Sequence, residues 1–170
     1  MSVFQRISIT ALIALFALSN CGFRLKQQAD LSGSIKDITL VYKNLDPAFM
    51  HQLKNSLEQA GIHIIDDSVN MLSIQRYDER KRTIASDTVT AKPTETQIDY
   101  RLSFSFTHDK QLLIAPNELH VSKEFMNNNT DIAGMLDEER NLKKSAQQEL
   151  IDLLLHRLQR LETIETDHGN

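Results

Sequence analysis

The strictest pattern in this chain is the alternation of apolar and polar residues between Ile98 and Thr107. Apolar side chains occupy every second position, and polar side chains fill the positions between them. Because successive side chains of a strand point to opposite faces, this period of two predicts a strand with one buried and one solvated face. A sheet of such strands must cover its apolar face, so we expect helices to pack against it.

The residues before this strand predict one strand and one helix. Residues 38–43 alternate in the same way and predict a half-buried strand. Asp46 and Pro47 are typical of the cap and first position of a helix, and Gly61 is typical of its end. The apolar face of this helix recurs every three or four residues and comprises Phe49, Leu53, Leu57 and Ala60.

The rest of the chain predicts three strands and a second helix. A long polar strand spans residues 71–89, residues 90–96 with Pro93 form a hairpin tip, and the alternating strand follows. Its partner comes after the turn at residues 108–110 and has Leu119, Val121, Lys123 and Phe125 on one face. From about residue 130 the apolar spacing is helical, with Leu142, Ala146, Leu150, Leu153, Leu154, Leu158 and Leu161 on one stripe.

This order of elements predicts an α+β fold. We expect a two-layer sandwich in which a four-stranded, mostly antiparallel sheet carries two helices on one face, in the order β-α-β-β-β-α. The domain should span residues 35–162 and be followed by a polar tail at residues 163–170. A chain of 170 residues is long enough for one such core.

Residues 1–20 predict a signal peptide rather than a membrane span. Arg6 gives a positive start, and residues 7–18 are apolar except for Ser8 and Thr10. Twelve helical residues reach only about 18 Å, whereas the hydrocarbon core of a bilayer is about 30 Å thick. The segment is therefore expected to direct export and to be removed.

Cys21 is the only cysteine of the chain and directly follows this segment. Residues 18–21 resemble the bacterial lipobox, although Asn20 departs from its usual small residues. An exported protein with one thiol cannot form an internal disulfide, and lipidation accounts for the thiol. We therefore expect Cys21 to be lipidated and residues 21–34 to tether the domain to a membrane. Bacterial lipoproteins that stay in the inner membrane have Asp directly after the lipidated cysteine, whereas this chain has Gly22. We therefore expect the protein to lie on the periplasmic side of a Gram-negative outer membrane.

The sequence contains no motif that is typical of an active site. Its six histidines lack zinc-ligand spacing and its five glycines form no phosphate-binding loop, so we expect no enzyme activity, metal or cofactor. A net charge of −4 disfavours nucleic acid as a partner. Basic residues could instead meet phosphates of an anionic lipid, or be ordinary solvated charges. They are Arg80, Lys81, Arg82, Lys92, Arg101, Lys143 and Lys144.

Short motifs in a fixed order resemble those of the LptE family of lipopolysaccharide-assembly lipoproteins. The opening Cys-Gly-aromatic-x-Leu motif is present at residues 21–25, and residues 38–42 and 46–65 resemble the family's first strand and helix. Residues 98–102 resemble its central strand with a tyrosine, residues 121–128 the approach to its last helix, and residues 148–158 that helix.

This resemblance implies an outer-membrane partner and a lipid ligand. The partner would be the β-barrel LptD, which the family plugs and helps to fold, and the ligand would be lipopolysaccharide on its way to the outer leaflet. The family's basic positions fall at Lys92 and Lys144, with Lys143 as a neighbour of uncertain role, and Arg101 is a further candidate contact. Two alternatives remain open: another non-catalytic lipoprotein, such as a secretin pilotin or a barrel-assembly accessory, and a periplasmic enzyme or small-ligand carrier.

Overall fold

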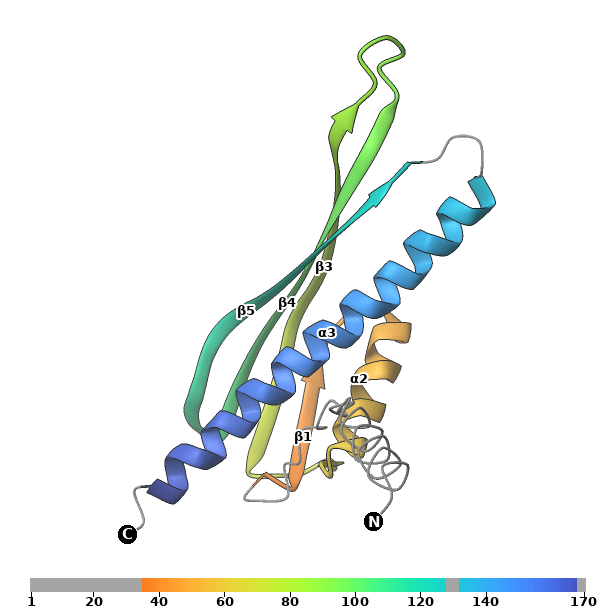
Figure 1. Ribbon diagram of the computed structural model, residues 1–170. Coiled ribbons are helices and arrows are strands. Elements are labelled where there is room, and N and C mark those ends of the chain that lie inside the picture. Colours follow the sequence, from red (N-terminus) through yellow and green to blue (C-terminus); the bar gives the residue numbers. More distant parts are fainter. Residues whose placement is uncertain (1–34, 128–131, 168–170) are drawn as a thin grey trace, which may run out of the picture.

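The computed structural model describes residues 35–127 and 132–167, with side chains described up to residue 161. Two helices and five strands make up this part of the chain (Figure 1). In chain order they are β1 (Asp37–Tyr42), α2 (Pro47–Gln59), β2 (His63–Ile64), β3 (Asn70–Ser86), β4 (Pro93–His108), β5 (Gln111–Met126) and α3 (Ile132–Asp167).

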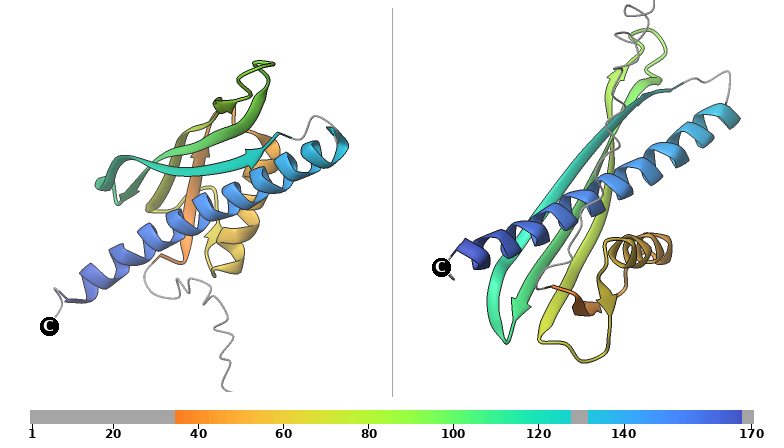
Figure 2. Two further views of the ribbon diagram at one scale, coloured as in Figure 1. Left: turned by 45° about the horizontal axis from the view of Figure 1, so that its top comes forward. Right: turned by 60° about the horizontal axis from the view of Figure 1, so that its bottom comes forward.

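The strands form one mixed sheet in the order β2-β1-β3-β4-β5. The three long strands β3, β4 and β5 are antiparallel neighbours, and β1 pairs in parallel with both β2 and β3. The predicted α+β class is confirmed, and both helices lie on the same side of the sheet (Figure 2, left). The sheet has five strands instead of the expected four. The additional strand, β2, was not predicted because its two residues are too few to show a period of two.

Strand β4 carries the centre of the core. Its five alternate apolar side chains have no solvent-exposed surface, as the alternation predicts: Ile98, Tyr100, Leu102, Phe104 and Phe106. On the neighbouring strands, Leu72 and Ile74 of β3 and Leu119 and Val121 of β5 are buried beside them. The apolar face of the sheet is therefore continuous across its three longest strands.

Helix α2 begins and ends where its sequence predicts. The Asp46 carboxylate accepts a hydrogen bond from the Ala48 amide at 2.9 Å, and Pro47 occupies the first turn. Gly61 has a φ of +82°, a left-handed conformation that glycine adopts without strain, so the chain turns there towards β2. Phe49 is fully buried and stacks on Tyr77 of β3, with ring centroids 4.4 Å apart. This contact fixes α2 against the sheet.

Helix α3 crosses the sheet diagonally (Figure 1) and packs on β4, β5 and α2. Its buried apolar side chains are Ala146, Leu150, Ile151, Leu154, Leu155 and Leu158. The predicted apolar stripe was wrong at Leu153, which is 38% exposed. The buried face of the helix includes Ile151 and Leu155 instead. The helix also continues to Asp167, into the segment 163–170 that was expected to be a tail.

The β3–β4 hairpin projects beyond the rest of the sheet (Figure 1). Its tip was predicted at residues 90–96 but lies at residues 87–92, and Pro93 is the first residue of β4, where the missing N–H is tolerated. The Asp87 carboxylate holds the tip by accepting hydrogen bonds from the Val89 and Thr90 amides and from the Thr90 hydroxyl. These bonds lower the pKa of Asp87.

The Tyr100 hydroxyl is buried without a hydrogen-bond partner among the described residues. An unpaired buried hydroxyl costs about 1–3 kcal/mol of desolvation, and its ring packs as a phenylalanine would. We predict that Tyr100→Phe leaves the free energy of unfolding unchanged or raises it by about 1 kcal/mol in urea titrations. Leu102→Ala in the same strand should lower it by about 2–5 kcal/mol. A loss above about 1 kcal/mol in Tyr100→Phe would contradict this assignment.

Candidate functional site

The predicted site residues lie on separate parts of the molecule and do not form one cluster. Cys21, the predicted lipidation site, lies outside the described residues. Lys92 lies in the turn at the tip of the β3–β4 hairpin, Arg101 lies in β4, and Lys143 and Lys144 lie in α3. Each position therefore has to be judged by its own contacts.

Lys143 is a structural residue. Its ammonium lies 3.3 Å from a carboxylate oxygen of Asp46 and 3.2 Å from one of Glu79, so it joins the start of α2 to β3 and α3. Burial alone would lower the pKa of Lys143, but the two carboxylates outweigh burial and raise it. Burial alone would raise the pKa of Asp46, but the Ala48 amide and Lys143 lower it. The ammonium of Lys143 is therefore already paired with two carboxylates of the protein.

Lys144 is exposed, although it is the next residue in the chain. Consecutive side chains of an α-helix diverge by about 100°, which turns Lys144 away from the two carboxylates. Its side chain lines a groove between α2 and α3. Of the two adjacent lysines, Lys144 is the one that can meet a ligand.

Lys92 is exposed at the hairpin tip, where its backbone carbonyl accepts a hydrogen bond from the Asp87 amide at 2.8 Å. The backbone of this residue closes the turn, so the position of its side chain depends on the hairpin. The side chain itself stands at the end of the molecule that projects beyond the sheet. Lys92 is therefore placed to touch whatever approaches that end.

Arg101 belongs to the face of the sheet that the helices leave uncovered, which we call the open face. Its guanidinium lies 3.8 Å from a carboxylate oxygen of Glu118 in β5, and its side chain is 33% exposed. The Arg101 Nε is buried and has no partner among the described residues. Arg101 therefore belongs to a different surface from Lys144, which lines the groove between the helices.

Charged side chains pair with one another on the open face, both along β3 and between neighbouring strands. Asp78 accepts hydrogen bonds from Arg76 at 2.7 Å and from Arg80 at 3.1 Å, and these arginines lower its pKa. Asp99 lies 3.1 Å from His120 and 3.8 Å from Arg82. Burial alone would raise the pKa of Asp99, but His120, Ser122 and Arg82 lower it. The open face is thus strongly polar, and its charged side chains are held in place by ion pairs with one another.

The basic run at residues 80–82 is divided between the two faces of the sheet. Arg80 and Arg82 meet the acidic residues of the open face, whereas the Lys81 ammonium lies 2.7 Å from Glu139 of α3. This division follows from the geometry of a strand, because neighbouring residues of β3 point to opposite faces of the sheet. The three residues therefore do not form a single cationic cluster.

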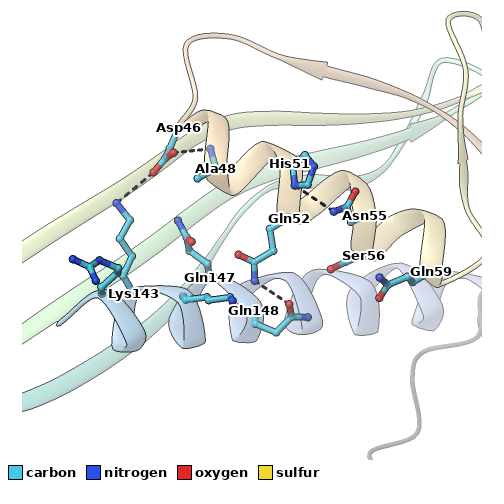
Figure 3. Close-up of a pocket in the computed structure, with 12 residues that line it drawn as sticks. Asp46, Ala48, His51, Gln52, Asn55, Ser56, Gln59, Lys143, Gln147 and Gln148 are labelled. Carbon is cyan, nitrogen blue, oxygen red and sulfur yellow. Dashed lines mark hydrogen bonds and ion pairs between the residues drawn. The ribbon is translucent and has the colours of Figure 1, made fainter. Parts of the chain in front are cut away.

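The groove between α2 and α3 has a volume of about 670 Å³ and was not predicted from the sequence (Figure 3). Gln52 of α2 donates a hydrogen bond across it to Gln148 of α3 at 2.9 Å. His51 and Asn55 interact along α2 at 3.2 Å. The full lining is Asp46, Ala48, His51, Gln52, Asn55, Ser56, Gln59, Arg140, Lys143, Lys144, Gln147 and Gln148.

A family model described as LptE, lipopolysaccharide assembly, matches residues 33–158 of this chain. The chain belongs to the LptE family. The match spans the sheet, α2 and nearly all of the buried part of α3, and it confirms the resemblance that the short motifs indicate. A comparison with the curated proteins finds no match.

Solved structures of lipoproteins share the fold of this LptE-family chain. An uncharacterized lipoprotein B from Nitrosomonas europaea superposes with a TM-score of 0.70 at 13% identity, covering 88% of this chain and 97% of that chain. The rare lipoprotein B from Shewanella oneidensis gives 0.59 at 13% identity, over 79% and 99%. A minor lipoprotein from Acinetobacter baumannii gives 0.55 at 16% identity, over 78% and 94%.

Neither helix that the structure describes is long and apolar enough to span a bilayer. The same described residues present two polar surfaces: the paired charges of the open face and the groove between the helices. The first suits a polar protein surface, and the second has the size of a ligand site.

The two adjacent lysines of this LptE-family chain should differ in their effect on stability. Lys143→Ala leaves Asp46 and Glu79 without their shared cation, so we predict a loss of about 1 kcal/mol in the free energy of unfolding at pH 7. Lys144→Ala should change it by less than about 0.5 kcal/mol. Equal losses in urea titrations of the two variants would contradict the assignment.

The loss in Lys143→Ala should depend on pH. The pKa of Asp46 is lowered from 3.8 by folding, so its share of the stabilisation is present above that value and disappears as the pH falls through the lowered pKa. The difference between Lys143→Ala and the parent should therefore shrink in acid. A difference that stays constant from pH 7 to pH 2 would show that the ion pair is not its cause.

Proposed function

We propose that this chain is an outer-membrane lipoprotein that is anchored through Cys21, plugs the LptD barrel and helps it to fold, and contributes to lipopolysaccharide binding and assembly. Its membership of the LptE family carries this proposal. The role is non-catalytic: the domain would act at the periplasmic side of the outer membrane by binding a protein and a lipid.

The open face is the surface that we assign to the barrel. Interiors of outer-membrane barrels are polar, so a partner inside one must present polar groups that pair with it. The open face meets this requirement because it is covered with arginines and carboxylates, as around Asp78 and Asp99. The apolar face is covered by α2 and α3 and is not free for a partner.

Binding alone accounts for assistance in folding. A plug that binds the folded barrel and not the unfolded chain stabilises the folded barrel by mass action. No chemical step by the plug is needed for this effect. The lysines at the hairpin tip and on α3 would then meet phosphates of lipopolysaccharide as point charges.

Co-purification from outer membranes tests the partner. The full chain, extracted in mild detergent through an affinity tag at its C-terminus, should bring down LptD in amounts detectable by mass spectrometry. Cys21→Ala should fail to be acylated and should recover less barrel, because an unanchored domain is diluted away from the membrane. Recovery of no barrel would overturn the proposal, and recovery of a secretin would favour a pilotin instead.

Charge reversal tests the lipid contact. Lys92→Glu and Lys144→Glu should each weaken lipopolysaccharide binding roughly fivefold at low salt, because a charge-assisted contact is replaced by repulsion. Raised ionic strength should reduce the difference, since both side chains are exposed. Lys36→Glu and Lys43→Glu make the same charge change elsewhere and are the controls. Equal affinity in all four variants would remove the lipid contact but leave the plug.

A further inference from the structure

The groove between α2 and α3 is lined almost entirely by hydrogen-bonding side chains. Only Ala48 among its lining residues lacks a polar side chain. Five carboxamides come from the two helices, and the aliphatic stems of these long side chains supply the apolar surface between their polar ends. The carboxamide residues are Gln52, Asn55, Gln59, Gln147 and Gln148. A carboxamide both donates and accepts hydrogen bonds, as does a sugar hydroxyl.

Contacts between the lining residues hold the groove in shape. Gln52 and Gln148 meet across it at 2.9 Å, and Gln148 also donates to Asp152 at 3.0 Å. Gln147 donates to the Tyr77 hydroxyl at 3.1 Å and so joins the groove to the core. The side chains are therefore oriented before a ligand arrives, which lowers the entropic cost of binding.

The lining of the groove has more basic than acidic side chains, although the protein as a whole is acidic. The lining contains Arg140, Lys143 and Lys144 against the single carboxylate of Asp46, whereas the whole chain has a net charge of −4. Lys143 is held by Asp46 and Glu79, so the available cations are Lys144 and Arg140. Arg140 pairs with Asp137, but both side chains are more than two-thirds exposed, and such pairs contribute little.

We propose that the groove between α2 and α3 binds an anionic glycan, with its carboxamides on the sugar hydroxyls and with Lys144 and Arg140 on a carboxylate or phosphate of the sugar. The inference rests on the proposed function, because the sugar portion of lipopolysaccharide is the glycan that this protein would encounter. A volume of about 670 Å³ suits a short oligosaccharide. A docked amphipathic helix is anchored by apolar side chains of its receptor, and Ala48 is the one apolar residue among those lining the groove.

The double variant Gln52→Ala/Gln148→Ala tests the carboxamides. Calorimetric titration would use the full chain in detergent, with the acyl-free oligosaccharide obtained by deacylating lipopolysaccharide as the probe. The parent should bind this probe, and the double variant should bind it roughly tenfold more weakly, since two hydrogen bonds are lost. Gln111→Ala removes an exposed carboxamide on β5 and should change nothing. Asn55→Ala is the second variant if circular dichroism shows that the double variant is unfolded.

Three further titrations separate the parts of the ligand. If Lys144 recognises a phosphate, Lys144→Ala should weaken binding of the phosphorylated oligosaccharide several-fold and leave binding of a dephosphorylated one, which keeps only its carboxylates, unchanged. If Lys144 recognises a carboxylate, the variant should weaken binding of both oligosaccharides. Inorganic phosphate alone should bind far more weakly than the oligosaccharide. Equal binding of inorganic phosphate, no binding by the parent, or an equal loss in Gln111→Ala would each overturn the proposal.

The two proposals fail in different ways. If the groove binds no glycan, the double variant should still recover LptD from membranes, and only this inference is lost. If the plug proposal is wrong, no variant recovers the barrel, while the titration with soluble oligosaccharide keeps its own result. A double variant that keeps oligosaccharide affinity but loses the barrel would show that the groove receives a protein segment instead.

Discussion

The structure depends on burying one side of strand β4. Its five apolar side chains have no exposed surface, and the long helix packs across this apolar face on both β4 and β5. Because side chains alternate along a strand, a register slip of one residue would turn the whole set towards solvent, so the pairing with β3 and β5 is strongly specified. The polar open face follows from the same constraint: the residues between the buried ones have nowhere else to point.

The two faces then divide the chemistry. Arg80 and Arg82 reach the open face while Lys81 reaches Glu139 of α3, so consecutive residues of one strand serve the proposed partner surface and the contact with the helix. On α3, Lys143 is held between α2 and β3, and Lys144 is left in the groove. The stabilising ion pairs thus determine which basic residues remain available for a ligand.

Local sequence patterns predicted the features that depend on local rules. The alternation gave the buried face of β4, and Asp46, Pro47 and Gly61 gave the bounds of α2, because caps and strand periods involve only neighbouring residues. β2 was missed since two residues show no period, and Leu153 was misplaced since the packed stripe of α3 depends on the angle at which the helix crosses the sheet. The groove could not be predicted, because Gln52 and Gln148 meet only once α2 and α3 are placed side by side. The period of two alone would have been enough to predict that the basic residues 80–82 are split between the two faces of the sheet.

Site-specific photo-crosslinking in living cells tests the assignment of the two surfaces most directly. A photoreactive amino acid at Ser103, in the middle of the open face, should form a crosslink to LptD, whereas the same amino acid at Gln59, in the groove, should crosslink lipopolysaccharide and not the barrel. Gln111 serves as the position outside both surfaces. Crosslinks to the barrel from Gln59 together with none from Ser103 would contradict the account, because they would place the protein partner against the helices instead of the sheet.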